Sequence, residues 1–244
     1  PSIALKKVTP VCDEATAVLE RYGYAMRRTL VNEDEPVHMR RRRALMEPFT
    51  PAQLAHHEPL VRRLVREHVD RIIDTGKADL VEEMLYDVPL TVALHFLGVP
   101  EDDMAMLRKY SVAHVVNTWG RPTREEQVAV AESVGRFWRF AGEVLDRMRQ
   151  DPSGPGWMPY AIRLQPQMPD VITDSYLHSI MMAGIVAAHE TTANAAANAI
   201  RLLLENRPVW EEICADQRRI PNAVEECLRP SGSVKAWRRI ATTD

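Results

Sequence analysis

The 244-residue sequence has few cysteines, few aromatic residues and almost no excess of charge of either sign. Its three cysteines, Cys12, Cys214 and Cys227, are too few and too widely spaced for a disulfide framework or a zinc knuckle. A formal net charge of −3, with 27% charged residues, gives no basis for binding a polyanion. We therefore expect a protein of the reducing cytoplasm that has no nucleic acid as partner.

Long apolar runs are also missing. The longest, residues 180–188, is about half the length that a membrane-spanning helix needs. The opening stretch, PSIALKKVTP, contains no apolar core of the kind found in signal peptides. Hydrophobic residues make up 45% of the chain, enough for the core of one large domain or two modest ones. We expect a soluble protein with no membrane partner.

Helical periodicity is the main pattern that is present. Apolar residues recur at three- and four-residue steps from 60 to 73 and stop at Gly76, which predicts an amphipathic helix. Residues 79–100 predict a second helix, interrupted or kinked near Pro89. A third is predicted from about Glu125 to Gln150.

The second half of the chain predicts one unusually long helix. It starts after an N-cap at Thr173 and runs to about Asn206. Two shorter helices follow, with Pro208 and Pro221 near their first turns. A loop is predicted at 152–159, which is rich in proline and glycine, and a strand at 233–244. The fold class is therefore mainly α with a small β part.

The centre of the long predicted helix, GIVAAHETTANA, carries an acid and two hydroxyls. Inside a helix, the Thr191 hydroxyl can bond the carbonyl of Ala187 and bend or widen the helix locally. The small side chains of Ala187 and Ala188 leave room for a flat or diatomic ligand, and Glu190 and Thr191 can pass protons to it. The alternative is an alanine-rich helix with Glu190 simply exposed.

His38 and Arg42 stand four residues apart, so a helix that starts at about Pro36 places them on one face. Together they can clamp an anionic group through charge-assisted hydrogen bonds. The alternative for the run Arg40 to Arg43 is a basic face in contact with solvent.

Two further charged features lie near the C-terminal end. Glu226 and Arg229 form an i, i+3 pair of opposite sign, and such pairs are common on helix surfaces. Arg239 lies in the predicted strand, where an ordinary edge-strand charge is the alternative.

In their order along the chain, these four segments together resemble the cytochrome P450 superfamily. The resemblance implies that His38 and Arg42 bind haem propionates. It also implies that Glu190 and Thr191 deliver the protons that dioxygen cleavage needs. Ala187 and Ala188 match the positions beside the haem, although Ala188 replaces the usual glycine.

The same resemblance assigns the remaining residues. Glu226 and Arg229 match a buried structural pair near the haem, and Arg239 matches another propionate contact. It places residues of the substrate pocket at Ala183, Val234 and Trp237.

The activity implied is that of a haem-thiolate monooxygenase with haem b. Such an enzyme inserts one atom of O2 into a small organic, apolar substrate, with electrons from a reductase or ferredoxin. The segment AAHETTANA is most similar to bacterial self-sufficient members, in which FMN and a 2Fe-2S cluster belong to a fused reductase.

The superfamily binds iron through a cysteine in a loop several dozen residues after the Glu-x-x-Arg pair. None of the three cysteines has that context, so we expect no metal ligand in this chain. Residues 1–244 are therefore expected to be a partial haem domain that lacks the N-terminal sheet region and the cysteine loop. The alternative is a catalytically inert helical binding protein derived from the superfamily.

Overall fold

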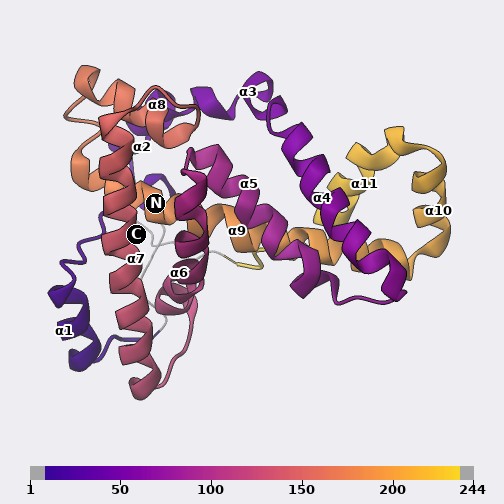
Figure 1. The fold of residues 1–244 in the computed structure, drawn as a ribbon, viewed down its shortest axis with the longest axis horizontal. Helices are drawn as coiled ribbons and strands as arrows, with labels where there is room; N and C mark the ends of the chain where they lie inside the picture. Colours follow the sequence, from indigo (N-terminus) through magenta and orange to yellow (C-terminus); the bar gives the residue numbers. More distant parts are fainter. Residues whose placement is uncertain (1–8, 237–244) are drawn as a thin grey trace, which may run out of the picture. The chain divides into compact units, whose positions relative to one another are not determined.

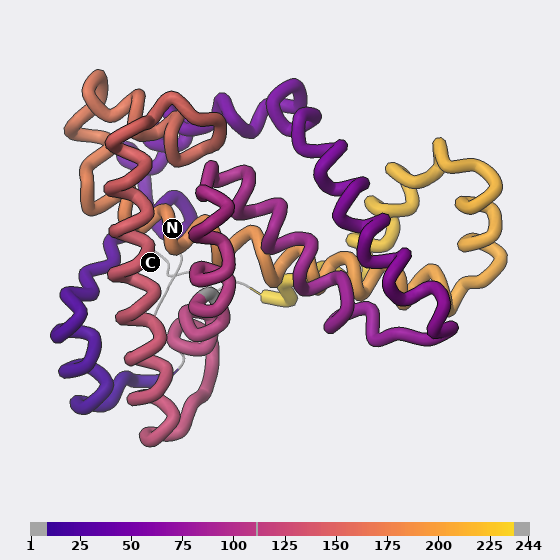
Figure 2. The backbone as a smooth tube through the Cα atoms, viewed as in Figure 1, coloured from indigo at the N-terminus to yellow at the C-terminus, as the bar shows by residue number. Residues whose placement is uncertain are grey.

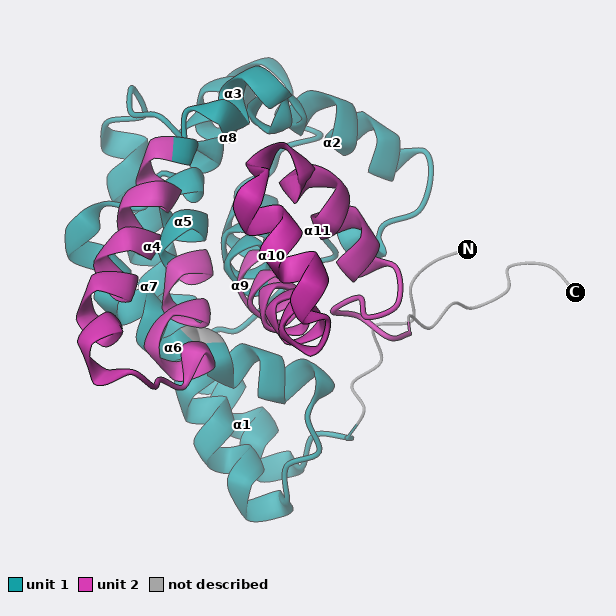
Figure 3. Cartoon of the chain, turned by 90° about the vertical axis from the view of Figure 1, so that its right-hand side faces the viewer, with its two compact units in different colours: residues 1–58, 91–186, 238–244 teal, residues 59–90, 187–237 magenta. Residues whose placement is uncertain are grey.

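The structure, a computed structural model, describes residues 9–236 apart from the side chain of Ser111 (Figure 1). Within this range all regular elements are helical and no strand is present. The chain divides into two compact units (Figure 3). The described residues of unit 1 are 9–58 and 91–186, and those of unit 2 are 59–90 and 187–236.

The helices of unit 1 are α1 (Asp13–Arg21), α2 (Val37–Leu45), α3 (Pro51–Ala55), α6 (Glu101–Trp119), α7 (Arg124–Gln150) and α8 (Trp157–Leu164). Those of unit 2 are α4 (Glu58–Ile72), which begins at the unit boundary, a π-helix (Val81–Leu85), α10 (Arg207–Ala215) and α11 (Ile220–Leu228). Two helices, α5 (Asp87–Leu97) and α9 (Asp174–Glu205), contribute residues to both units. Short 3₁₀ turns lie at Leu30–Asn32, Glu47–Phe49, Ile73–Thr75, Gln165–Gln167 and Gln217–Arg219.

The core of unit 1 is built on α7, with α1 and α6 packed along it (Figure 2). A capping box starts this helix: the Thr123 hydroxyl accepts from the Glu126 amide, and the Glu126 carboxylate accepts from the Thr123 amide. Its inward face repeats at three- and four-residue steps and is completely buried. That face includes Val134, Phe137, Ala141 and Val144.

The predicted helices at 60–73 and 125–150 are confirmed as α4 and α7. After α4, Gly76 takes the left-handed conformation, with φ 67°, that favours glycine. The interruption predicted near Pro89 is present: it lies at Tyr86, between the π-helix and α5. Pro89 is in the first turn of α5, where a missing N–H removes no intrahelical bond.

The loop predicted at 152–159 is shorter than expected, because α8 begins at Trp157. Pro159 is in the first turn of that helix, where proline is tolerated. The predicted strand is absent from residues 233–236, and the rest of it, 237–244, lies outside the described residues. The mainly helical class itself is confirmed.

Candidate functional site

The segment that carries the acid and hydroxyls lies inside α9. The Thr173 hydroxyl accepts a hydrogen bond from the Tyr176 amide (3.2 Å), so the predicted N-cap is confirmed. The helix is assigned as α-helical without interruption from Asp174 to Glu205. The bending or widening expected near Thr191 is therefore not accompanied by a break in the α-helical hydrogen-bond pattern.

The residues predicted to deliver protons, Glu190 and Thr191, lie toward the face of α9 that carries Ala187. The Thr191 hydroxyl donates to the Ala187 carbonyl oxygen at 2.7 Å, as predicted. Glu190 shares this face, since it lies three residues after Ala187. It is half-buried rather than exposed, and burial raises the pKa of its carboxyl group. Ala188 is half-buried beside it.

The opposite side of the same turn is anchored in unit 2. The side chain of His189 is buried, and its Nε2 lies 2.8 Å from the Tyr86 carbonyl oxygen. The two rings meet edge to face with centroids 4.2 Å apart. Burial and the Glu190 charge raise the pKa of the Tyr86 phenol, which places that phenol within electrostatic reach of Glu190. Sequence reasoning missed Tyr86, which directly follows the π-helix.

His38 and Arg42 both lie on α2, as predicted. The Nδ1 atom of His38 lies 3.1 Å from a carboxylate oxygen of Glu35. Arg42 is exposed and makes no hydrogen bond or ion pair with any other described residue. Its guanidinium N–H groups are therefore available to bind an anionic group.

The arginines beside Arg42 differ from one another. Arg40 is exposed and bonds Asp170 at 2.7 Å. Arg41 is largely buried and forms an ion pair with Glu33. The predicted solvent-exposed basic face therefore does not extend over the whole run.

Glu226 and Arg229 form a bidentate pair on α11, with bonds of 3.0 and 2.7 Å. The pairing lowers the pKa of the Glu226 carboxyl group. Their side chains are 65% and 71% exposed, respectively, which contradicts the predicted burial. The reason is the orientation of α11, which turns Cys227 inward while no described element covers the charged face.

The remaining predicted residues have different surroundings. Ala183 is half-buried on α9, and Val234 is exposed after α11. Trp237 and Arg239 lie outside the described residues.

The three cysteines are free: Cys12 is half-buried, Cys214 is exposed and Cys227 is buried. Among residues 9–236, no three histidine, cysteine or acidic side chains are arranged to hold a metal ion. The described helices include no candidate for a membrane span.

A long helix with an acid–threonine pair, a His-x-x-x-Arg helix and a Glu-x-x-Arg helix together define the class of cytochrome P450 haem domains. The fold agrees with that class: an intact type IV self-sufficient cytochrome P450 monooxygenase matches 100% of this chain with 77% identity and a TM-score of 0.96. The chain belongs to the cytochrome P450 superfamily. No family model matches it.

Other relatives agree with this assignment. The haem domain of Acinetobacter radioresistens CYP116B5 is 63% identical, with a TM-score of 0.92 over 98% of this chain and 58% of its own. Nocardicin C N-oxygenase from Nocardia uniformis subsp. tsuyamanensis is 32% identical over 88% of this chain. The chain spans about half the length of its curated relatives, 53% of that enzyme, and 32% of the intact self-sufficient protein.

Proposed function

We propose that the full-length protein is a haem-thiolate monooxygenase that inserts one oxygen atom of O2 into a small organic, apolar substrate. The observation that carries this proposal is the face of α9 on which Thr191 bonds Ala187 beside the half-buried acid Glu190. An acid held next to a hydroxyl on a helix of small residues is suited to proton delivery in a confined site.

The residues present fit haem b. Arg42 is an exposed cation without a partner among the described residues, and His38 shares its face of α2, so both suit propionate groups. Ala187 is exposed and Ala188 half-buried, and their small side chains suit the close approach of a flat macrocycle. Arg239 is proposed as a further propionate contact.

When bound, the haem supplies the iron that activates dioxygen with electrons from a reductase. The chain's own residues supply the protons. The raised pKa of Glu190 lets its carboxyl group hold a proton at a higher pH than an exposed glutamate. The Thr191 hydroxyl, which donates to Ala187, keeps its lone pairs available to accept that proton and pass it on.

The structural roles follow the same assignment. Glu226 and Arg229 form the pair that supports haem incorporation, and the residues proposed for the substrate pocket are Ala183, Val234 and Trp237. None of the three cysteines is proposed as the iron ligand: Cys12 is the half-buried N-cap residue of α1, Cys214 is exposed on α10, and the Cys227 thiol lies 3.9 Å from the Ala199 carbonyl oxygen. Residues 1–244 are thus proposed as part of a haem domain whose ligating cysteine is not among them.

The likeness to an intact self-sufficient enzyme supports a reductase as the electron donor. We place FMN and a 2Fe-2S cluster in such a reductase, fused to the haem domain, with a separate ferredoxin as the alternative donor. The free cysteines fit a reducing cytoplasm.

Replacing Thr191 tests the proposed proton delivery. In the full-length protein, Thr191→Ala should retain haem but lower the product formed per electron pair by roughly tenfold or more, with hydrogen peroxide in its place. Thr192→Ala is the matched control, since Thr192 is exposed on the next position of α9. Equal coupling in both variants, measured as product and peroxide per reduced nicotinamide consumed, would reject the role of Thr191.

A further inference from the structure

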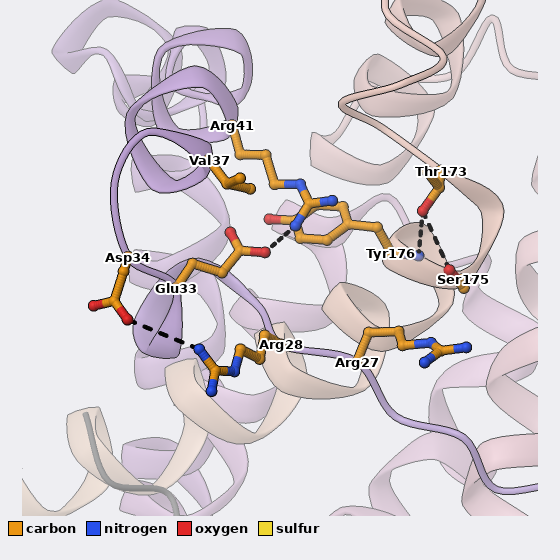
Figure 4. Close-up of a pocket in the computed structure, with 9 residues that line it drawn as sticks. All are labelled: Arg27, Arg28, Glu33, Asp34, Val37, Arg41, Thr173, Ser175 and Tyr176. Atoms are coloured by element: carbon orange, nitrogen blue, oxygen red, sulfur yellow. Dashed lines mark hydrogen bonds and ion pairs between the residues drawn. The ribbon is translucent and has the colours of Figure 1, made fainter. Parts of the chain in front are cut away.

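Unit 1 contains a pocket that the proposed oxygenase chemistry does not use. Its volume is about 410 Å³, and it lies between the segment that precedes α2, α2 itself and the first turn of α9 (Figure 4). Its α2 residues, Val37 and Arg41, differ from His38 and Arg42, the residues proposed for haem.

The floor of the pocket holds two buried polar groups with unused hydrogen-bonding capacity. The side chain of Glu33 is 4% exposed, and one of its oxygens pairs with Arg41. Its other oxygen, Oε2, is buried without a hydrogen-bond partner among the described residues. The hydroxyl of Tyr176, a residue that is 1% exposed, is likewise buried; it lies near the backbone of Leu30 but makes no well-aligned hydrogen bond with a described residue.

These groups are fixed in place by Arg41. Its guanidinium carbon lies 4.0 Å from the centre of the Tyr176 ring, and its Nε donates to the Val171 carbonyl oxygen at 2.8 Å. Burial raises the pKa values of both Glu33 and Tyr176. The floor is thus a preorganised carboxylate and phenol rather than two mobile surface groups.

The charged groups at the two ends of the pocket differ in their pairing (Figure 4). At the α9 end, the exposed side chain of Arg27 has no partner among the described residues, and Ser175 adds a hydroxyl in the first turn of that helix. Helix N-termini favour negative charge. At the α2 end each acid has an arginine beside it: Glu33 pairs with Arg41, and Asp34 lies 3.8 Å from Arg28.

We propose that this pocket binds a small zwitterion of the amino-acid class. Its carboxylate is held by Arg27 and the first turn of α9. Its ammonium group donates to the unused Oε2 of Glu33, and the Tyr176 hydroxyl adds a hydrogen bond. A simple anion leaves the Glu33 oxygen unsatisfied, and a simple cation leaves Arg27 unsatisfied.

The test uses the full-length protein and 4-aminobutyrate, titrated calorimetrically. Butyrate and butylammonium are the matched ligands, since each carries one of its two charges. The proposal requires 4-aminobutyrate to bind at least roughly tenfold more tightly than either, because each end makes a charge-assisted bond. Equal affinities, or no binding by 4-aminobutyrate at millimolar concentration, would show a merely hydrated pocket and overturn the proposal.

Two variants locate the site. Tyr176→Phe removes a hydroxyl that makes no well-aligned hydrogen bond among the described residues, so affinity should fall roughly threefold to tenfold. The midpoint of thermal unfolding checks that this variant keeps its fold. Arg27→Gln should weaken binding by at least roughly tenfold. Arg43→Gln is the control, since Arg43 is an exposed arginine of α2 outside the pocket. Unchanged affinity in both pocket variants would place any binding elsewhere and reject this site.

Discussion

Neighbouring side chains in one turn of α9 point in different directions and have different roles. His189 is buried against Tyr86, while Glu190 and Thr191 lie toward the face of Ala187. Successive residues of an α-helix point about 100° apart, so a single buried anchor fixes the direction of the next two side chains. The contact between His189 and Tyr86 therefore orients the proposed proton-delivery pair.

The raised pKa of Glu190 gives a prediction with a definite sign. When folding raises the pKa of a carboxyl group, the group stabilises the folded protein at pH values below its pKa in the unfolded chain. This contribution to the free energy of unfolding is lost as the pH rises through the pKa in the folded protein. The pH range over which Glu190 loses its contribution to stability thus begins near the ordinary pKa of 4.5 and extends above it. Glu190→Gln should become progressively more stable than the unchanged protein as pH rises through that window.

Urea unfolding of the full-length protein between about pH 5 and 8 measures this difference. Glu20→Gln, at an exposed position of α1, is the control and should show little such trend. A stability difference between Glu190→Gln and the unchanged protein that stays constant with pH would contradict the buried-acid account.

Local residue geometry was predictable, and long-range geometry was not. The bond from Thr191 to Ala187 and the cap at Thr173 follow from helical spacing alone, and both are present. The Tyr86 contact joins positions 103 residues apart, which periodicity does not connect. The exposure of Glu226 also depends on which elements cover α11, and a motif does not contain that information.

Among the elements, α4 and α7 were predictable from their single apolar faces, and α9 from a long stretch with almost no helix breaker. The bounds of α4, α7 and α9 lie within about two residues of those expected, a normal uncertainty for helix ends. Helix α6 was not predicted, because apolar residues occur around its whole circumference and give no periodic signal. The break near Pro89 and the start of α8 were expected a few residues later than they occur. Both expectations treated proline as a helix breaker, whereas Pro89 and Pro159 lie in first turns, where proline is tolerated.

The end of α5 and the start of α8 meet through two glycines. Gly98 has φ 79°, and a Cβ there would lie 2.5 Å from the Pro155 carbonyl oxygen. Gly156 has φ 114°, and its added Cβ would lie 2.6 Å from the Cα of Gly98. Both positions therefore need glycine for backbone conformation and for close approach.

Alanine at either position should destabilise the protein by more than about 1 kcal/mol, because the native backbone conformation is strained for any other residue. Gly154→Ala is the control, since a Cβ there meets nothing within 4 Å. The midpoint temperature of thermal unfolding measures the stability of each variant. Equal midpoints for Gly98→Ala, Gly156→Ala and Gly154→Ala would show that the contact is unimportant.

At the scale of the whole molecule, fold class and superfamily followed from the sequence because four motifs occur in the required order. The structural match over the whole chain confirms both. The division into two units did not follow, since each unit combines separate stretches of the sequence. The oxygenase activity is therefore proposed for the full-length protein, since this chain spans about half the length of its curated relatives.

The central claim, haem-thiolate chemistry, is tested most directly by a carbon-monoxide difference spectrum of the reduced, full-length protein supplied with haem. We expect the red-shifted Soret band of a thiolate-ligated haem. The chain of residues 1–244, supplied with haem in the same way, should not give that band. No thiolate band from the full-length protein would contradict the account and favour a helical binding protein that has lost the chemistry of its superfamily.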